Sequence, residues 1–332
     1  MSQTIVRKYN LLLNNRGGLR AVLKTYGVMR LLDTAMREAW IGCGIRILRM
    51  LGRRPGNSYG WLEAVLFPAC DYWLRYSRVL CALADVEYEG TLGLLEVSSG
   101  RGGLAWLSRD PRLRICLVDR NEESLSDGRG GDSWRVCADA VRLPFPSNSF
   151  DVVLSVDTVE HLPAEHRESF VNELKRIAER AIVITCPLQS ESGEFRAGDC
   201  DRRLRKEIES AKGHVPEWLE EHLREGHPTL EHLLQWLPDA RITGTQNCDA
   251  WLRYASLYVR PFGWLIAGLR YRAILGERDA VPPYWRGTLV WDKRSLCLQS
   301  HADESAISES EPNPDLLAAE LSPSPIMSSQ NY

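Results

Sequence analysis

Short apolar runs alternate with amphipathic stretches through the middle of the chain, and this alternation predicts a parallel α/β sheet. The runs that predict strands cover residues 92–97, 114–118, 134–137, 150–156 and 181–185, and later runs at 240–244 and 286–291 could complete the sheet. Between the fourth and fifth runs, Phe170, Leu174 and Ile177 form a helical stripe suited to packing on a sheet. In such sheets ligands bind beyond the carboxyl ends of the strands, so we expect the chemistry there.

Helical periodicity marks the start of the chain and a later insertion. Apolar residues spaced by threes and fours predict an amphipathic helix within residues 28–50, weakened by Gly42 and Gly44. An aromatic-rich helix is predicted over residues 61–84, and residues 188–238 form a charged, helix-prone insertion. We expect this insertion to act as a lid.

The C-terminal residues have a composition that predicts disorder. Residues 301–332 hold six acids and no Lys or Arg among many Ser, Pro and Asn positions. Such a segment cannot bury enough apolar surface to offset the entropy of ordering. We therefore divide the chain into a basic helical extension or lid over 1–85, an α/β domain over 86–300 and a disordered acidic tail over 301–332.

Composition is that of a soluble globular chain, with 44% hydrophobic and 26% charged residues in a length of 332. The nine cysteines are scattered and form no Cys-x-x-Cys pair, which suits buried thiols in a reducing compartment, so we expect a cytoplasmic location. Uncharged apolar runs such as 261–269 are shorter than the roughly 20 residues of a spanning helix. No feature specifies an oligomeric state.

The first 60 residues are locally basic, with eleven Lys or Arg against Asp33 and Glu38. This segment could be a lid on the sheet, a surface for anionic lipid or a nucleic-acid patch, in that order of preference. Together with the apolar Trp264, Leu265 and Ile266 it would permit peripheral contact with a membrane surface. We expect no nucleic acid as a partner, because the net charge is -3 and no recognition motif is present.

The first candidate for chemistry is the glycine-rich turn after the first predicted strand, Leu-Leu-Glu-Val-Ser-Ser-Gly-Arg-Gly-Gly-Leu-Ala at residues 94–105. Glycines such as Gly100 and Gly102 allow a ligand to approach the backbone closely. The segment from Gly100 to Ala105 also satisfies the dinucleotide pattern GxGxxA, with Asp119 nineteen residues after Gly100. The turn alone therefore fits NAD as well as other adenosyl cofactors.

Two carboxylates flank this turn. Glu96 lies just before it, where it would repel a pyrophosphate but favour an ammonium group such as that of a methionine moiety. Asp119 ends the second predicted strand, from which a carboxylate can accept hydrogen bonds from both hydroxyls of a ribose. Glu96 thus indicates a cationic ligand, whereas Asp119 does not separate NAD from S-adenosylmethionine.

Residues 137–155 carry the most specific motif, Cys-Ala-Asp-Ala-Val-Arg-Leu-Pro-Phe-Pro-Ser-Asn-Ser-Phe-Asp-Val-Val-Leu-Ser. The motif resembles the Asp-Ala-x-x-Leu-Pro-Phe-Pro-x-x-Ser-Phe-Asp-x-Val run of class I S-adenosylmethionine-dependent methyltransferases of the methyltransferase-11 type. The resemblance covers about residues 92–187. It implies a Rossmann-like, seven-stranded, mostly parallel methyltransferase sheet, here with N-terminal helices and a helical insertion.

The resemblance also implies roles for single residues around the cofactor S-adenosyl-L-methionine. Gly100 and Gly102 would pack against its methionine and ribose parts, and Glu96 would help hold its amino group. Asp119 would bind the ribose diol. Asp139 would accept a hydrogen bond from the adenine amine, with the backbone of Ala140 beside it.

Other positions of the motif carry further expectations. The stretch from Ser155 to His161 would border the transferred methyl group, while Asp151 is interpreted as structural. Ser98 stands where the family usually has the first glycine of the turn, and Ser99 where it often has cysteine. The side chain of Ser98 could narrow the methionine end of the site.

Histidines supply the candidates for catalysis. His161 could act as a general base on the methyl acceptor, because its imidazole titrates near neutrality, or it could cap the next helix or line the pocket. The insertion holds His214, His222, His227 and His232, and the last three are five residues apart, which does not keep them on one helical face. We expect no metal site, and interpret His214 or His222 as a base or substrate contact.

The predicted function is methyl transfer from S-adenosylmethionine, without a catalytic metal, to a hydroxyl of a glycan or glycolipid precursor. The acceptor is inferred from a looser similarity, at residues 72–80, 221–223 and 226–228, to methyltransferases of bacterial cell-surface glycan biosynthesis. Methylation of a small lipophilic metabolite, of quinone or polyketide type, is the alternative among enzymes. A non-catalytic binding module with a methyltransferase fold is the third reading, which Ser98 keeps open.

Overall fold

The computed structural model describes residues 71–293, with gaps at 85, 87–89, 109, 127–130, 213 and 261, and selected residues between Leu32 and Val65. The chain separates into two units, residues 1–291 and 292–332. The fold described below belongs to the first unit, and its last strand, β7 (Tyr284–Asp292), reaches the boundary between the two units. The predicted disordered tail and most of the predicted N-terminal extension lie outside the described residues.

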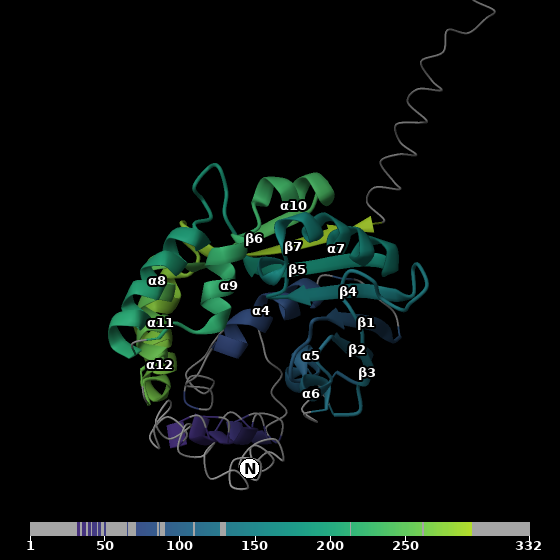
Figure 1. Ribbon diagram of the computed structural model, residues 1–332. Helices are drawn as coiled ribbons and strands as arrows, with labels where there is room; N and C mark the ends of the chain where they lie inside the picture. The colour runs from purple at the N-terminus through teal and green to yellow at the C-terminus, as the bar shows by residue number, and fades with distance from the viewer. Residues whose placement is uncertain are drawn as a thin grey trace, which may run out of the picture. The chain divides into compact units, whose positions relative to one another are not determined.

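A seven-stranded sheet with the strand order β3-β2-β1-β4-β5-β7-β6 forms the centre of the fold (Figure 1). Strands β1 to β5 pair in parallel, whereas β6 and β7 pair antiparallel to each other. The strands are β1 (Leu92–Val97), β2 (Leu113–Asp119), β3 (Trp134–Cys137), β4 (Phe150–Val156), β5 (Ala178–Pro187), β6 (Arg241–Asn247) and β7 (Tyr284–Asp292). All seven predicted runs are strands, so the expected mostly parallel sheet is confirmed.

The central strands are buried on both faces, which explains their continuous apolar runs. In β1, Leu94 and Leu95 are both fully buried although they point to opposite faces, and in β4 the same holds for Val152 and Val153. The chain runs outward from β1 through β2 to β3, and then crosses to β4 on the other side of β1. The carboxyl ends of β1 and β4 therefore flank a switch point, where open α/β sheets bind ligands.

Helices cover both faces of the sheet. They include α4 (Asp71–Ala84), α5 (Gly103–Leu107), α6 (Glu122–Leu125) and α7 (Ala164–Ile177), and a 3-10 turn, η1 (Val159–His161), follows β4. Figure 1 shows α7 and α10 (Leu230–Trp236) on one side of β4 and β5, with α4 and α5 on the other. The apolar stripe of α7 is buried as predicted, and α6 has only four residues.

The predicted insertion is helical and forms a second core with helices that follow β6. It contains α8 (Ala197–Lys212), α9 (Glu217–Glu225) and α10, and the later helices are α11 (Cys248–Tyr258) and α12 (Trp264–Arg270), with short turns η2 (Tyr271–Leu275) and η3 (Gly276–Arg278) after them. Leu204 and Ile208 of α8 pack with Leu219 of α9 and Trp251 of α11 in one buried cluster. The insertion is thus a packed layer of helices.

Helix α11 was not predicted from the sequence. It does carry an amphipathic pattern, because Asp249, Arg253 and Ser256 are spaced by four and three residues on one face and apolar residues fill the others. The signal that could have marked its start is Asn247, whose side chain accepts hydrogen bonds from the backbone N–H groups of Asp249 and Ala250 as an N-cap.

None of the described helices has the length and apolar character needed to cross a membrane. Of the three apolar residues that suggested surface contact with a membrane, Trp264 is fully buried and its indole Nε1 donates to Asp33 Oδ1 at 2.6 Å. Ile266 is 56% exposed. The same apolar segment therefore contributes mainly to the core.

Replacing Gly287 in β7 with alanine should destabilise the fold. An added Cβ would clash with Leu188 Cδ1 and would lie 3.1 Å from both Ile242 Cδ1 and Phe195 Cε1. Overpacking a filled core typically costs about 1–3 kcal/mol. Urea titration of Gly287→Ala should show a loss of this size in the free energy of unfolding.

Gly93→Ala in β1 is the matched control for that substitution. Its Cβ would meet only the end of a side chain, Asp151 Oδ2 at 3.3 Å, which can give way more easily than a packed core. We expect a clearly smaller loss. Equal losses in the two variants would contradict the close packing around Gly287.

Candidate functional site

The turn after β1 adopts a left-handed backbone at several positions. Gly100 has φ 57° and Gly102 has φ 98°, values that glycine adopts without a Cβ clash. Ser98 has φ 59°, so it adopts the left-handed conformation in spite of its side chain. Ser98, at the position where the resembling methyltransferases usually have glycine, therefore adds a side chain to the turn but keeps the backbone conformation of a glycine.

Asp119 joins the end of β2 to this turn. Its Oδ2 accepts a hydrogen bond from Gly100 N at 2.9 Å, and its Oδ1 accepts one from Asn121 N at 2.8 Å. The residue is half-buried, and each carboxylate oxygen has a second lone pair. Asp119 can thus shape the turn and still accept hydrogen bonds from a ligand.

Asp139 and Ala140 follow β3 at the same edge of the sheet. Ala138 N donates to Asp119 O at 3.2 Å, which brings the end of β3 beside the end of β2. Asp139 is exposed, and its Oδ1 accepts from Val141 N at 3.1 Å. The predicted ribose and adenine residues are therefore neighbours on adjacent strands.

Ser155 lies on the other side of the turn, within β4. It pairs in register with Val97 and is completely buried, and its Oγ has no hydrogen-bond partner among the described residues. This position places it under the edge of the sheet, directly before the residues that line the cavity described below.

Glu96 is buried inside β1, where both carboxylate oxygens are used. Tyr76 OH donates to Oε1 at 2.6 Å and Leu104 N donates to Oε2 at 2.6 Å. Burial raises the pKa of Glu96 to about 7, although both hydrogen bonds act in the opposite direction. A Cβ at Gly103 would clash with this carboxylate, which explains the glycine there. Glu96 holds α4 and α5 to β1.

A buried ion pair follows β4. Asp157, with φ 49°, accepts hydrogen bonds from Arg286 of β7 through both oxygens, one of them from Nη2 at 2.9 Å, and Arg75 Nε lies 3.2 Å from Oδ2. Burial opposes ionisation, but Arg286 and then Arg75 hold the pKa of Asp157 below its usual value. Sequence reasoning missed this pair, although an arginine inside the apolar run of β7 was a signal.

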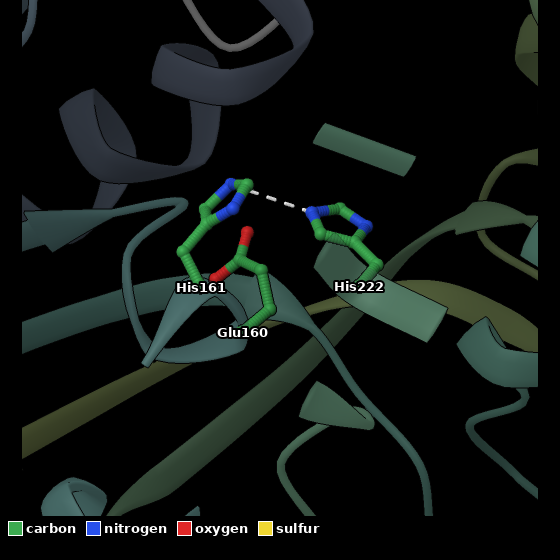
Figure 2. Close-up of side chains that lie close together, drawn as sticks. All are labelled: Glu160, His161 and His222. Atoms are coloured by element: carbon green, nitrogen blue, oxygen red, sulfur yellow. Dashed lines mark hydrogen bonds between the residues drawn. The ribbon is translucent and has the colours of Figure 1, made fainter. Parts of the chain in front are cut away.

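Glu160 and His161 lie in η1, directly after that ion pair (Figure 2). Glu160 is completely buried, and neither carboxylate oxygen has a hydrogen-bond partner among the described residues. Burial, and next the charge of Asp157, raise its pKa well above the usual value. Burial and then His222 lower the pKa of His161, against the effect of Glu221. His161 is therefore neutral near pH 7.

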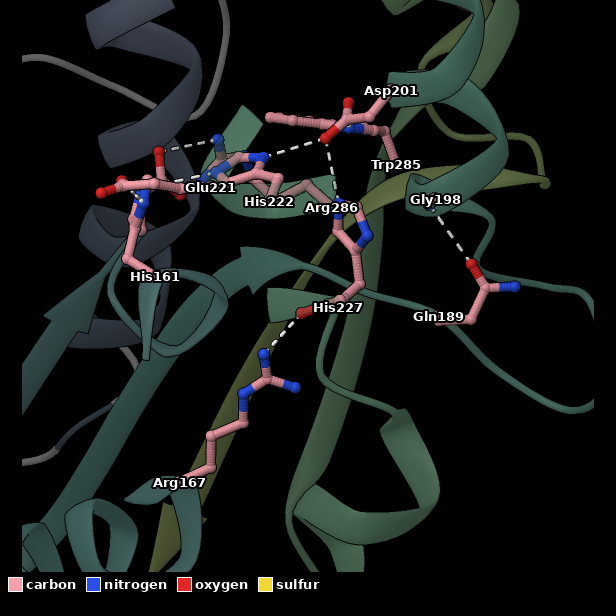
Figure 3. Close-up of polar contacts among 12 residues, drawn as sticks. His161, Arg167, Gln189, Gly198, Asp201, Glu221, His222, His227, Trp285 and Arg286 are labelled. Carbon is pink, nitrogen blue, oxygen red and sulfur yellow. Dashed lines mark hydrogen bonds and ion pairs between the residues drawn. The ribbon is translucent and has the colours of Figure 1, made fainter. Parts of the chain in front are cut away.

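The insertion brings more polar groups to His161 (Figure 3). His161 Nδ1 lies 2.9 Å from Glu221 Oε2, and its Nε2 lies 3.4 Å from His222 Nε2. His222 Nδ1 and His227 Nε2 each lie 2.9 Å from Asp201 Oδ2. These contacts join η1 to α8 and α9.

Three of the five histidines singled out in the sequence meet at this place, and two do not. His222 is near the end of α9, and the turn at Gly226, with φ 70°, carries the chain back so that His227 reaches the same carboxylate. His214 is exposed and His232 stacks on Trp236. The five-residue spacing was a poor guide because His227 lies beyond the helix.

A cavity of about 410 Å³ adjoins these groups. Its lining combines indole rings with charged and imidazole side chains. The lining residues are Arg37, Arg75, Asp157, Glu160, His161, Leu204, Trp218, His222, Trp251, Ala255, Tyr258, Val259 and Trp285. Since the cavity begins at the end of β4 and the glycine turn follows β1, the two lie on the two sides of the switch point.

The matched family agrees with this architecture. Residues 95–181 match a family model described as a methyltransferase domain, a range that holds Glu96, the glycine turn, Asp119, Asp139 and η1. The matched segment holds the first four strands and the start of the fifth, so the family model covers about a quarter of the chain and lies at the centre of the observed Rossmann-like, mostly parallel sheet.

Solved structures with similar folds share little sequence with the chain. A SAM-dependent methyltransferase from Archaeoglobus fulgidus is 17% identical, with 71% of this chain and 100% of that chain covered and a TM-score of 0.42. A putative methyltransferase from Bacillus halodurans is 15% identical, with 64% and 96% covered and a TM-score of 0.41. A putative sarcosine dimethylglycine methyltransferase from Galdieria sulphuraria is 16% identical, with 68% and 85% covered and a TM-score of 0.43. No curated protein matches the chain.

Glu96→Gln should remove a pH dependence of stability. Between the unfolded pKa of about 4.3 and the folded value of about 7, folded Glu96 keeps a proton that the unfolded chain releases, so its contribution to stability is lost as pH rises. The loss over this window is on the order of 3 kcal/mol. Urea titrations at several pH values should show wild type losing stability relative to the variant. Parallel curves would contradict the raised pKa.

Ser98→Gly should stabilise the protein, because glycine adopts φ 59° without the Cβ clash that costs an L-residue roughly 1–2 kcal/mol. The greater freedom of unfolded glycine offsets part of this, which leaves a gain of about 1 kcal/mol. Thermal unfolding measures it. Ser98→Ala keeps the Cβ and should show no such gain, so equal stabilisation by both variants would argue against strain at this position.

Proposed function

We propose that the protein is a methyltransferase that uses S-adenosyl-L-methionine. The observation that carries the proposal is the order of groups along one edge of the sheet: the left-handed glycine turn, Asp119 bonded to it, and Asp139 on the next strand. The acceptor cavity lies on the other side of the turn, beyond Ser155. A cofactor bound along this edge would have its adenosine over β2 and β3 and its methionine part near the cavity.

The residues present fit this cofactor. Asp119 has free lone pairs for ribose hydroxyls, Asp139 is exposed at the adenine position beside Ala140, and an added Cβ at Gly100 would meet no atom within 4 Å, so the turn has room for a ligand. Gly102 and Ser98 complete the turn on the methionine side. Glu96 acts by holding the turn through Leu104, since its buried carboxyl group is already bonded to Tyr76 and to Leu104 N.

The cofactor supplies an electrophilic methyl group, so the protein must orient the acceptor, exclude water and deal with the acceptor's proton. The cavity can orient an acceptor, because three indole rings and Tyr258 form part of its wall and would shield the acceptor from water on that side. His161 lies in its wall with a neutral imidazole, and we assign to it the action on the acceptor proton.

We propose a hydroxyl of a glycan or glycolipid precursor as the acceptor. The indole of Trp218, which is 37% exposed, suits a ring that carries polar groups at its edge, while Trp251 and Trp285 stack on each other and form the buried wall behind it. Arg37, together with the ion-paired Arg75, would favour an anionic group such as the phosphate of a glycolipid precursor. A neutral quinone or polyketide precursor would use the aromatic faces but not the arginines. Assays with radiolabelled cofactor and both kinds of acceptor separate these two.

The cofactor assignment is tested by calorimetry on the intact protein. We expect S-adenosylmethionine to bind, and Asp119→Ala to weaken binding at least tenfold, because the variant loses both the ribose contact and the bond that shapes the turn. Asp132→Asn, an exposed acid before β3, is the control and should bind as wild type does.

Other outcomes of this titration would decide against the proposal. Preference for NAD would indicate a dehydrogenase. Equal binding by Asp119→Ala and wild type would contradict the assignment of Asp119 to the cofactor site. Tight binding of the cofactor without methyl transfer to either kind of acceptor would support the alternative of a non-catalytic binding module.

A further inference from the structure

We propose that Glu160, His161 and His222 form a binding site for a divalent transition-metal ion, and that the ion binds the hydroxyl of the methyl acceptor. This departs from the expectation of no metal that the histidine spacing suggested. The site itself stands on the geometry of the three side chains, whereas its role toward the acceptor rests on the proposed function.

The potential ligand atoms converge. One atom from each of Glu160, His161 and His222 lies within 4.8 Å of the others. The two imidazole Nε2 atoms are 3.4 Å apart, and Figure 2 shows the two rings approaching each other across the carboxylate. Two nitrogens bound ~2.1 Å from one tetrahedral ion would be separated by about 3.4 Å, so little movement is required.

The tautomers of both histidines are set by carboxylates. His161 Nδ1 pairs with Glu221 and His222 Nδ1 pairs with Asp201, each at 2.9 Å, and a carboxylate can only accept. Each Nδ1 therefore carries a proton, which leaves a lone pair on each Nε2. Two lone pairs that face each other at 3.4 Å repel unless a proton or a metal ion lies between them.

Glu160 supplies the independent observation. It is completely buried, lines the cavity and has no hydrogen-bond partner for either oxygen among the described residues. A buried polar group without a partner typically costs about 1–3 kcal/mol, and more when it is charged. A metal ion would satisfy this carboxylate and the two imidazole lone pairs together.

The surrounding contacts have the form of an outer coordination shell. Metal-binding histidines usually donate their second N–H to a carboxylate or carbonyl, which orients the ring and raises its basicity. Glu221 does this for His161, and Asp201 does it for His222. Asp201 is itself held by Trp285 Nε1 at 2.8 Å and by His227, as Figure 3 shows.

A second group, Asp201, His222 and His227, also brings potential ligand atoms together. There the atoms already bond to one another, since both histidines reach the same Asp201 oxygen at 2.9 Å. We therefore infer that Asp201 and His227 orient His222 and do not bind a metal ion themselves.

The ligand set indicates the kind of metal. Two imidazoles and one carboxylate suit Zn²⁺, Mn²⁺, Fe²⁺ or Co²⁺, whereas Mg²⁺ and Ca²⁺ prefer oxygen ligands throughout. Three protein ligands leave at least one coordination position open. All three residues line the cavity, so an acceptor oxygen can occupy such a position.

With the ion bound, His161 is a ligand through Nε2 and its Nδ1 carries a proton, so the ion takes over the action on the acceptor proton that the proposed function gives to His161 alone. A hydroxyl bound to a divalent ion is more acidic, so its O–H bond breaks with the electron pair left on oxygen and the proton passes to water. The oxygen, still bound to the ion, uses one lone pair to form the bond to the methyl carbon, while the bond from sulfur to that carbon breaks with its electron pair left on sulfur, which gives S-adenosylhomocysteine as the leaving group. His161 and His222 are thus positioning residues that act through the ion.

The test uses the full-length protein, freed of metal with a chelator and then titrated with Co²⁺. We expect one Co²⁺ per chain, with visible d–d absorption of nitrogen and oxygen coordination. Glu160→Gln and His161→Gln, which keep the size of each side chain closely, should each weaken Co²⁺ binding about a hundredfold. His232→Gln, a histidine stacked on Trp236 outside the cluster, is the control and should bind as wild type does.

A second measurement needs no variant. X-ray absorption of the wild-type protein loaded with Zn²⁺ should show two imidazole ligands at about 2.0–2.1 Å. Absence of Co²⁺ binding, binding unaffected by Glu160→Gln and His161→Gln, or a zinc spectrum without imidazole would overturn the metal site.

Calorimetry with S-adenosylmethionine on the same samples separates this inference from the proposed function. Cofactor binding without metal binding would contradict the metal site and support the proposed methyltransferase function. Metal binding without cofactor binding would contradict the methyltransferase function and support the metal site. Methyl transfer that is unchanged by chelation would overturn the role of the ion toward the acceptor.

Discussion

The ion pair between Arg286 and Asp157 joins β7 to the segment after β4, and the candidate site needs residues from both. Arg286 comes from β7, the last strand of the sheet in the chain, and Asp157 directly follows the central strand β4. Arg286 is only 1% exposed, so removal of either partner would leave a buried charge, which typically costs about 3–5 kcal/mol. Because η1 begins two residues after Asp157, the pair also determines where Glu160 and His161 lie.

The two sides of the site are built by different physical means. The cofactor side consists of backbone turns at the ends of parallel strands, held by short bonds from peptide N–H groups to Asp119 and Glu96. The acceptor side consists of side chains from η1, α8 and α9, held by pairs of histidine and carboxylate. Local geometry determines the cofactor side, and long-range packing determines the acceptor side.

For this reason the strands and turns that form the proposed cofactor side were predictable from the sequence. The first three strands, the glycine turn, Asp119 and Asp139 follow one another within a short stretch of sequence. There the spacing of apolar residues predicts the strands, and glycines and acidic residues predict the turns. The backbone of Ser98 was not predictable, because a serine reveals its left-handed φ only in the folded chain. Nor was the use of Glu96, whose two partners come from α4 and α5.

The sequence by itself determined the α/β fold, the strand positions and the candidate cofactor residues, since burial on both faces of a parallel sheet requires continuous apolar runs. Only the tertiary structure brought Glu160, His161 and His222 together, and paired Arg286 with Asp157. These contacts join residues about 60 and 130 positions apart, and they depend on how α8, α9 and β7 pack around the end of β4. The periodic pattern of apolar residues within one segment does not reveal such contacts, because packing depends on which surfaces meet in the folded chain.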